Sequence, residues 1–299
     1  MQNKQLLYHY CTEETFKSII KSKNLWLTKI IKTNDAEEVA RTYDIIWPQI
    51  YDELSKRFYG DANKLDVLDR INKQVQIDKE DSPDEQMNPF GICFSINRDL
   101  AQNWNEYGDK SRGLAIGFSE DIMYGIKHDM PHPNAIVDNS IGWNQVYYDR
   151  DDLMPQFVEL FAKMLAHDSM AFLTIPNTLR HYRSFIKNPT FQDEREVRII
   201  YYPSGGKNSS SECGISEVKD NVVIHCELPW LKNNICPIEE IIIGTNCSLS
   251  LEDVNRLLKK NGIEADISIV RSEYPYRISE NRVNKKSFLR SLVSWTKKV

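Results

Sequence analysis

Short blocks of apolar residues recur along the chain, and each is long enough for one β-strand but too short to span a membrane. They alternate with segments in which apolar residues recur at the helical spacing of three and four positions. This alternation predicts an α+β fold. The expected strands lie at 6–11, 25–27, 89–96, 113–118, 194–202, 221–228, 238–243 and 265–270. The expected helices lie at 13–23, 36–59, 98–107, 152–172, 251–260 and 284–297.

Two longer stretches lack this periodicity. Residues 60–88 are polar and partly helical and end in a charged run that can bury little surface, so we interpret them as a surface loop. Residues 120–145 carry Pro131 and Pro133 and are interpreted as irregular. We therefore expect one elaborated domain over 1–299, with a core at about 6–270 and a C-terminal helix at about 284–297. A helical and polar insertion is expected at about 36–88, and a helical insertion at about 120–190.

The composition excludes several classes of protein. The chain has 299 residues, of which 41% are hydrophobic and 27% charged, so collagen-like and wholly disordered chains are excluded. A net charge of -5 provides no overall positive field for nucleic acid, and we interpret the basic residues near the C-terminus as a solvated helix face rather than an RNA-binding surface. The first residues lack the apolar stretch of a secretory signal. We expect a cytoplasmic protein without membrane contact.

The common catalytic and metal-binding motifs are absent. The run Gly205-Gly206-Lys207 is followed by Asn208 rather than Ser or Thr, so it is not a nucleotide-triphosphate loop. There is no Gly-x-Gly-x-x-Gly, His-Glu-x-x-His or Gly-x-Ser-x-Gly motif. The six cysteines form no Cys-x-x-Cys pair, and we expect no metal site.

One predicted strand carries charges where it enters the apolar core. Because side chains alternate along a strand, Glu194, Glu196 and Arg198 are expected on one face, opposite to Val197 and Ile199. Such a face can hold a sugar hydroxyl and stabilise a developing positive charge. An exposed sheet edge with ion pairs between strands explains the same pattern and remains the alternative.

Aromatic and small residues mark a second candidate region. His9 is expected to point with Leu7 and Cys11, where a core histidine bonded to a backbone carbonyl is the simpler explanation. Ring-stacking residues and small residues also gather around the predicted helix at 98–107, and they predict either a pocket or a helix that packs its tryptophan into the core. The segments that carry them are Phe94-Ser95, Trp104, Tyr107-Gly108 and Arg112-Gly113.

Seven short motifs follow one another along residues 6 to about 270: Leu7-Tyr8-His9-Tyr10, Leu25-Trp26-Leu27 with Asn34-Asp35, Cys93-Phe94-Ser95, Trp104 with Tyr107, Arg112 to Phe118, Glu196-Val197-Arg198, and Ile241 to Gly244. In this order they resemble the bacterial family catalogued as domain of unknown function 2971. Where that family usually has tryptophan, this chain has Val197.

That family resembles a divergent branch of the ADP-ribosyltransferase fold, a split and strongly curved β-sheet that binds NAD. The resemblance implies an NAD-dependent transferase that modifies a macromolecule, as a toxin or phage-defence effector with an antitoxin or defence-system partner. A non-catalytic sensor of ADP-ribose or nucleotides is the alternative. By position, Glu196 would bond the nicotinamide ribose and Glu194 would orient an acceptor. The NAD-binding residues would be His9, Tyr10, Ser95, Trp104, Tyr107, Arg112 and Arg198.

Overall fold

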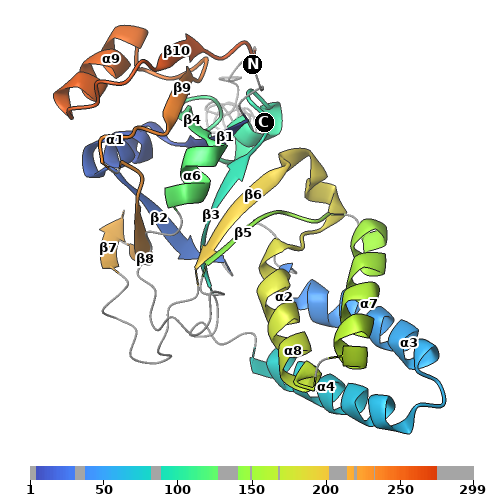
Figure 1. Cartoon of the computed structure of the whole chain (residues 1–299). Coiled ribbons are helices and arrows are strands. Elements are labelled where there is room, and N and C mark those ends of the chain that lie inside the picture. The colour runs from blue at the N-terminus through green and yellow to red at the C-terminus, as the bar shows by residue number, and fades with distance from the viewer. Residues whose placement is uncertain are drawn as a thin grey trace, which may run out of the picture.

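The computed structural model describes residues 5–30, 38–81, 89–126, 141–148, 150–167, 169–201, 214–218, 221–231 and 233–274. The strands described there form one curved, open sheet with helices on both faces (Figure 1). The sheet is mostly antiparallel, and only β9 and β10 run parallel, joined by α9. The fold is therefore a mixed α and β structure. The expected helix at 284–297 lies outside the described residues.

The strands are β1 (Leu6–Cys11), β2 (Asn24–Lys29), β3 (Phe90–Ser95), β4 (Leu114–Ser119), β5 (Ile141–Gln145), β6 (Glu196–Tyr201), β7 (Gly214–Val218), β8 (Asn221–Pro229), β9 (Ile238–Ile243) and β10 (Ser268–Arg271). Their order across the sheet is β10-β9-β4-β1-β3-β2-β8-β7, and β6 pairs with both β3 and β5. The strands β5 and β7 were not expected from the sequence. The segment 120–145, expected to be irregular, contains β5 and the helix α6 (Glu120–Ile126).

The sheet divides at β3. One edge of β3 pairs along its whole length with β6, from Phe90 opposite Tyr201 to Ser95 opposite Glu196. The other edge pairs with β2 at Phe90 and Gly91, and with β1 only at Ser95. Because β1 and β2 share this edge but diverge from it, the middle of β3 faces a gap between them. We call this place the fork.

The larger hydrophobic core lies on one face of the sheet. Strand residues such as Leu7, Ile116 and Ile199 pack there against α1 (Glu13–Ser22), α6 and α9 (Leu251–Lys260). Both α1 and α9 begin at side-chain caps: Thr12 accepts a hydrogen bond from the Thr15 amide, and Ser250 forms a capping box with Asp253. On the opposite face, α5 (Ala101–Glu106) packs Trp104 against Tyr8 and Tyr10.

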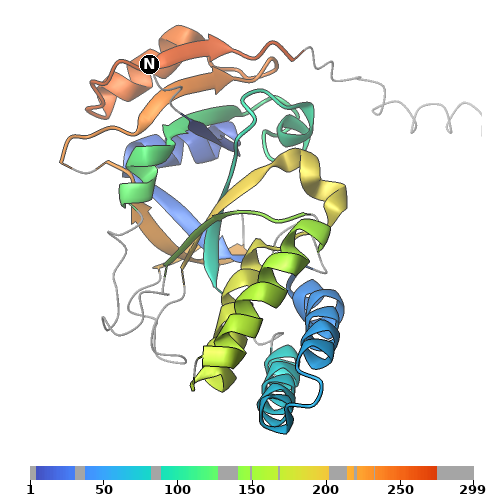
Figure 2. The same ribbon diagram turned by 45° about the vertical axis from the view of Figure 1, so that its right-hand side comes forward.

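A second hydrophobic core holds a helical cluster together (Figure 2). The cluster consists of α2 (Glu38–Arg41), a π-helical turn (Thr42–Ile46), α3 (Trp47–Arg57), α4 (Ala62–Asp81), α7 (Arg150–His167) and α8 (Ala171–Tyr182). The two insertions expected at 36–88 and 120–190 thus pack against each other. No described helix is both long and apolar enough to cross a bilayer.

Residues 60–88 are partly helical, as expected, but the expectation of a surface loop is wrong for α4, which buries Leu68, Ile71 and Val75 in this second core. The long expected helix at 36–59 is divided by the π-helical turn, because Pro48 has no N–H to continue the α-helical pattern. The expected helix at 152–172 ends at His167, and α8 follows it as a separate helix.

Two glycines, Gly113 and Gly244, allow neighbouring backbone segments to pack closely. A Cβ on Gly113 would lie 1.9 Å from the carbonyl oxygen of Cys11, and one on Gly244 would lie 2.2 Å from that of Ser111. The two glycines also meet directly, since the Gly244 amide donates to the Gly113 carbonyl at 3.0 Å. Only glycine fits at these positions.

Candidate functional site

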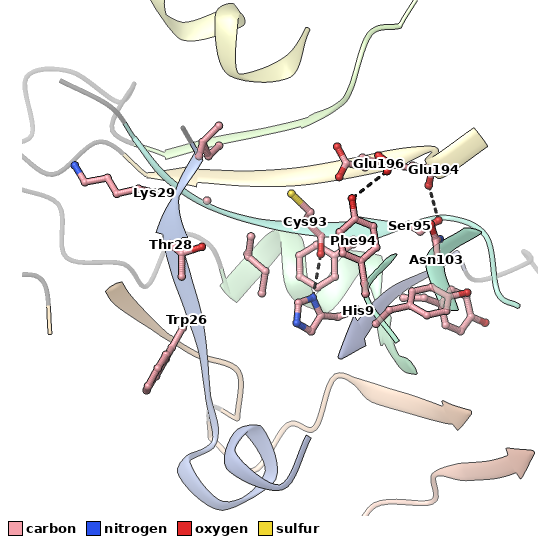
Figure 3. Close-up of a pocket in the computed structure, with 16 residues that line it drawn as sticks. His9, Trp26, Thr28, Lys29, Cys93, Phe94, Ser95, Asn103, Glu194 and Glu196 are labelled. Carbon is pink, nitrogen blue, oxygen red and sulfur yellow. Dashed lines mark hydrogen bonds between the residues drawn. The ribbon is translucent and has the colours of Figure 1, made fainter. Parts of the chain in front are cut away.

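A cavity of about 210 Å³ lies at the fork, between β1 and β2 and over the middle of β3 (Figure 3). Aromatic and aliphatic side chains form much of its wall, and polar side chains from α5 and the start of β6 converge on it. The lining residues used below are Tyr8, His9, Tyr10, Ser95, Asn103, Tyr107, Glu194 and Glu196.

His9 holds the open edge of β3. Its Nδ1 donates to the Cys93 carbonyl at 3.0 Å, and its ring meets Phe94 edge to face. That carbonyl lies in the part of β3 for which neither β1 nor β2 provides a strand partner. Burial lowers the pKa of His9, so the ring is neutral near pH 7. The expected hydrogen bond to a backbone carbonyl is confirmed, and His9 also lines the cavity.

Four buried charges lie beside the cavity, and we call them the cavity network: Lys187, Glu194, Glu196 and Arg198, each at most 5% exposed. The Lys187 Nζ lies 2.5 Å from Glu194 Oε2 and 3.6 Å from Glu196 Oε2. The Arg198 guanidinium donates to Glu196 Oε2 through Nη2 at 2.5 Å and Nε at 3.0 Å. Its Nη1 donates to the Ser184 carbonyl at 2.8 Å. Two carboxylates therefore face two cations inside the protein.

The electrostatics keep Glu196 ionised. Burial by itself raises the pKa of Glu196, but Arg198 and Lys187 outweigh this effect and hold the pKa below its ordinary value. Burial raises the pKa of Tyr107, and Glu194 and Glu196 raise it further. Tyr107 is therefore a neutral hydroxyl that donates to Glu194 Oε1 at 3.0 Å. The cavity therefore presents an anion at Glu196, and the Tyr107 hydroxyl beside it is already bonded to Glu194.

Period two is confirmed for β6, where Glu196 and Arg198 share a face and Val197 and Ile199 enter the main core. Glu194 lies outside the strand, at the end of a 3₁₀ helix (Pro189–Glu194). Arg195 takes a left-handed conformation, with φ at 43°, before β6 begins. Because of this turn, the side chains of Glu194 and Glu196 both approach Lys187. The expected strand over 194–202 is thus too long at its start.

A second cavity, of about 340 Å³, touches the other side of this turn. Glu196 lines both cavities, and Arg195 and Tyr148 line the second. The Tyr148 hydroxyl accepts a hydrogen bond from the Glu196 amide at 2.9 Å.

The structure brings most of the sequence-predicted site residues together. Tyr10, Ser95 and Tyr107 line the cavity with His9 and the two glutamates. Arg198 does not line the cavity, but it donates a hydrogen bond to Glu196. Trp104 is fully buried beside Tyr10 and donates to Asp99, as expected of a core tryptophan, and it does not line this cavity.

Arg112 also lies away from the cavity. It is half exposed and pairs with Asp109 at 2.6 Å. Neither Trp104 nor Arg112 is among the residues that line the cavity at the fork.

Lys187 and Asn103 were missed by sequence reasoning. Lys187 follows the buried pair Phe185 and Ile186, so a lone lysine after apolar residues was the available signal. Asn103 gave no signal, because one polar residue in a helix is ordinary. Among the described residues there is no group of three or more His, Cys, Asp or Glu side chains that could hold a metal ion.

Residues 103–199 match the sequence profile of a family described as "Protein of unknown function (DUF2971)". The match supports the family resemblance, over a shorter span than the motifs suggested. It includes Asn103, Tyr107 and the whole cavity network, whereas His9 lies outside it. No curated protein and no solved structure matches the chain.

Proposed function

We propose that the chain binds NAD at the fork and transfers ADP-ribose from it to a macromolecular acceptor, with Glu196 beside the nicotinamide ribose. One observation carries the proposal: an ionised, buried carboxylate lines a ring-sized cavity at the place where the sheet divides. The family resemblance supports the choice of NAD.

The proposed reaction uses the charge that Glu196 already carries. The bond between nicotinamide and ribose breaks, nicotinamide leaves with the bonding electron pair, and a nucleophile of the acceptor bonds to the ribose and loses a proton. The ribose becomes positively charged as the bond breaks, so a nearby carboxylate stabilises the transition state more than the ground state. Arg198 and Lys187 keep Glu196 deprotonated, which this role requires.

The size of the cavity limits what enters it. Ligand pockets for whole drug-sized molecules occupy about 300–1,000 Å³. The cavity at the fork, at about 210 Å³, is smaller than that range. We expect the nicotinamide ring and part of its ribose to occupy it, while the adenosine half lies outside.

A non-catalytic sensor of ADP-ribose or nucleotides is the second candidate. Both carboxylates of the cavity network already have a cation within 2.5 Å, as a purely structural network would. A site of this kind can bind a nucleotide without turning it over. The two candidates differ in whether nicotinamide is released.

The test uses NAD labelled in its adenosine half, incubated with the protein and a bacterial lysate. Release of nicotinamide and label on protein or nucleic acid are both measured. The variants are Glu196→Gln, which keeps the size of the side chain, and Asp78→Asn as a matched control that alters a buried, ion-paired carboxylate in the helical cluster. We expect Glu196→Gln to lose at least about a hundredfold in rate and Asp78→Asn to be unaffected.

Two results would contradict the transferase. Equal release by the wild type and Glu196→Gln would remove Glu196 from the chemistry. Saturable NAD binding by a folded wild type that releases no nicotinamide would favour the sensor.

A further inference from the structure

Asn103 is one of the residues that line the cavity at the fork, and its side chain ends in a buried amide (Figure 3). The residue is only 1% exposed, and neither Oδ1 nor Nδ2 has a hydrogen-bond partner among the described residues. The amide approaches the Tyr10 hydroxyl closely enough to lower its pKa, against the larger effect of burial, but the two groups do not meet hydrogen-bond geometry. Buried polar side chains nearly always have partners, so this amide requires an explanation.

The other buried polar side chains around Asn103 are already occupied. The Ser95 hydroxyl donates to the Glu194 carbonyl at 2.6 Å and accepts from the Asn97 amide at 3.1 Å. The Tyr10 hydroxyl lies within 3.1 Å of two backbone carbonyls and accepts from the Leu100 amide. Tyr107 donates to Glu194. Among the lining residues, Asn103 is the only described one whose fully buried polar side-chain atoms have no hydrogen-bond partner.

We infer that the Asn103 side chain binds the carboxamide of the nicotinamide ring and selects it over a carboxylate. This inference rests on the proposed function, because it takes the ligand to be NAD. Two primary amides pair in one plane, since Nδ2 donates to the ligand carbonyl while Oδ1 accepts from the ligand NH₂. A carboxylate in the same place offers only acceptors and would face Oδ1 without a proton between them. Asn103 is thus a specificity-determining residue, separate from the charge stabilisation at Glu196.

The binding test compares each amide with its acid. The full chain is titrated calorimetrically with nicotinamide, nicotinic acid, NAD and nicotinic acid adenine dinucleotide. We expect each amide to bind at least about tenfold more tightly than the matching acid, because the acid leaves a buried donor or acceptor unpaired.

The variant Asn103→Leu keeps a similar size and removes both polar atoms. We expect it to bring the amide-to-acid ratio to within about threefold. The nearby carboxylates Glu194 and Glu196 also repel an acid, but a preference caused by them alone would survive in Asn103→Leu.

Thermal unfolding of the ligand-free protein provides a second readout. Replacing a buried amide that has no protein partner is expected to leave Tm unchanged or raise it. The control Asn72→Leu removes the acceptor of the Trp47 indole N–H in the helical cluster, and it is expected to lower Tm and to leave the amide preference intact. A fall in Tm for Asn103→Leu together with an unchanged ratio would overturn the inference and show a structural amide.

The outcomes separate this inference from the proposed function. Amide-selective binding that Asn103→Leu abolishes, without release of nicotinamide from NAD, would support the inference and reject the transferase. Release of nicotinamide with a preference that survives in Asn103→Leu would support the transferase and overturn the inference. If none of the four compounds binds to the folded wild type, the inference is overturned.

Discussion

Two regions of the molecule bury carboxylates against cations, and they do so in different surroundings. In the cavity network, Glu194 and Glu196 face Lys187 and Arg198, and all four side chains are almost completely buried. In the helical cluster, Asp78 pairs with Arg180 at 2.7 Å, and the arginine side chain is 30% exposed. Asp78 also accepts from Gln74 and does not line the cavity at the fork.

The difference indicates which of the two networks can be explained by its contribution to stability alone. A pair at the edge of a helical cluster stays partly hydrated, so it costs little to form. Four charges removed from water cost several kcal/mol per ion, and apolar replacements of such networks are often as stable or more so. The proposed ligand would give the cavity network a role that folding alone does not provide.

The largest expected effect comes from removing one cation in each region. Lys187→Met leaves Glu194 without its closest cation inside the protein and is expected to lower the free energy of unfolding by about 3–5 kcal/mol. Arg180→Met is expected to cost about 1–2 kcal/mol, because Gln74 still donates to Asp78. Urea unfolding of both variants provides the comparison. Equal losses in the free energy of unfolding would mean that the two networks contribute equally to stability.

The next prediction tests whether buried side chains of α4 stabilise the helical cluster by packing. Ile71→Ala removes a side chain of α4 that is fully buried, and we expect a loss of about 2–5 kcal/mol from the cavity it leaves. Ile77→Ala, in the same helix but half exposed, is the matched control and is expected to change stability by less than about 0.5 kcal/mol. Urea unfolding measures both. Similar small values for the two variants would show that α4 is not held by packing.

The smallest expected effect is a change in how stability depends on acidic pH. The pKa of Glu196 is lowered in the folded state, so the unfolded chain takes up a proton at a higher pH than the folded protein does. The stability from this group is therefore complete above its ordinary pKa of about 4.5 and is lost as the pH falls towards the folded-state value. The slope approaches about 1.4 kcal/mol per pH unit in that window. Glu196→Gln should remove this part of the acid dependence in urea unfolding from pH 5 to pH 3, and an unchanged slope would contradict the assignment.

Local patterns predicted eight of the ten described strands and the helices α1, α5 and α9 of the sheet region, but not β5, β7 or α6. The alternation in β6 placed Val197 and Ile199 in the core, and Ser250 with Asp253 marked the start of α9. The same reasoning failed at α4, because its apolar residues are spaced widely among charges and become a core only when α7 and α8 cover them. Polarity alone was a poor guide where the partner surface came from a distant insertion.

The candidate site was predicted in part. His9, Ser95, Tyr107 and the two glutamates were singled out and do line one cavity, whereas Trp104 and Arg112 lie elsewhere. The expectation that Glu194 belongs to the strand was wrong, because Arg195 adopts a left-handed turn that redirects the chain.

The sequence by itself determined which residues alternate, where caps begin helices, and that charges enter an otherwise apolar strand, because these properties depend on neighbours along the chain. Only the tertiary structure decided that Lys187 meets both glutamates, that β1 and β2 diverge from the same edge of β3, and that the Asn103 amide lines the resulting cavity without a partner. The physical reason is that burial and charge pairing depend on residues brought together from separate segments, and no local pattern records which segments those are.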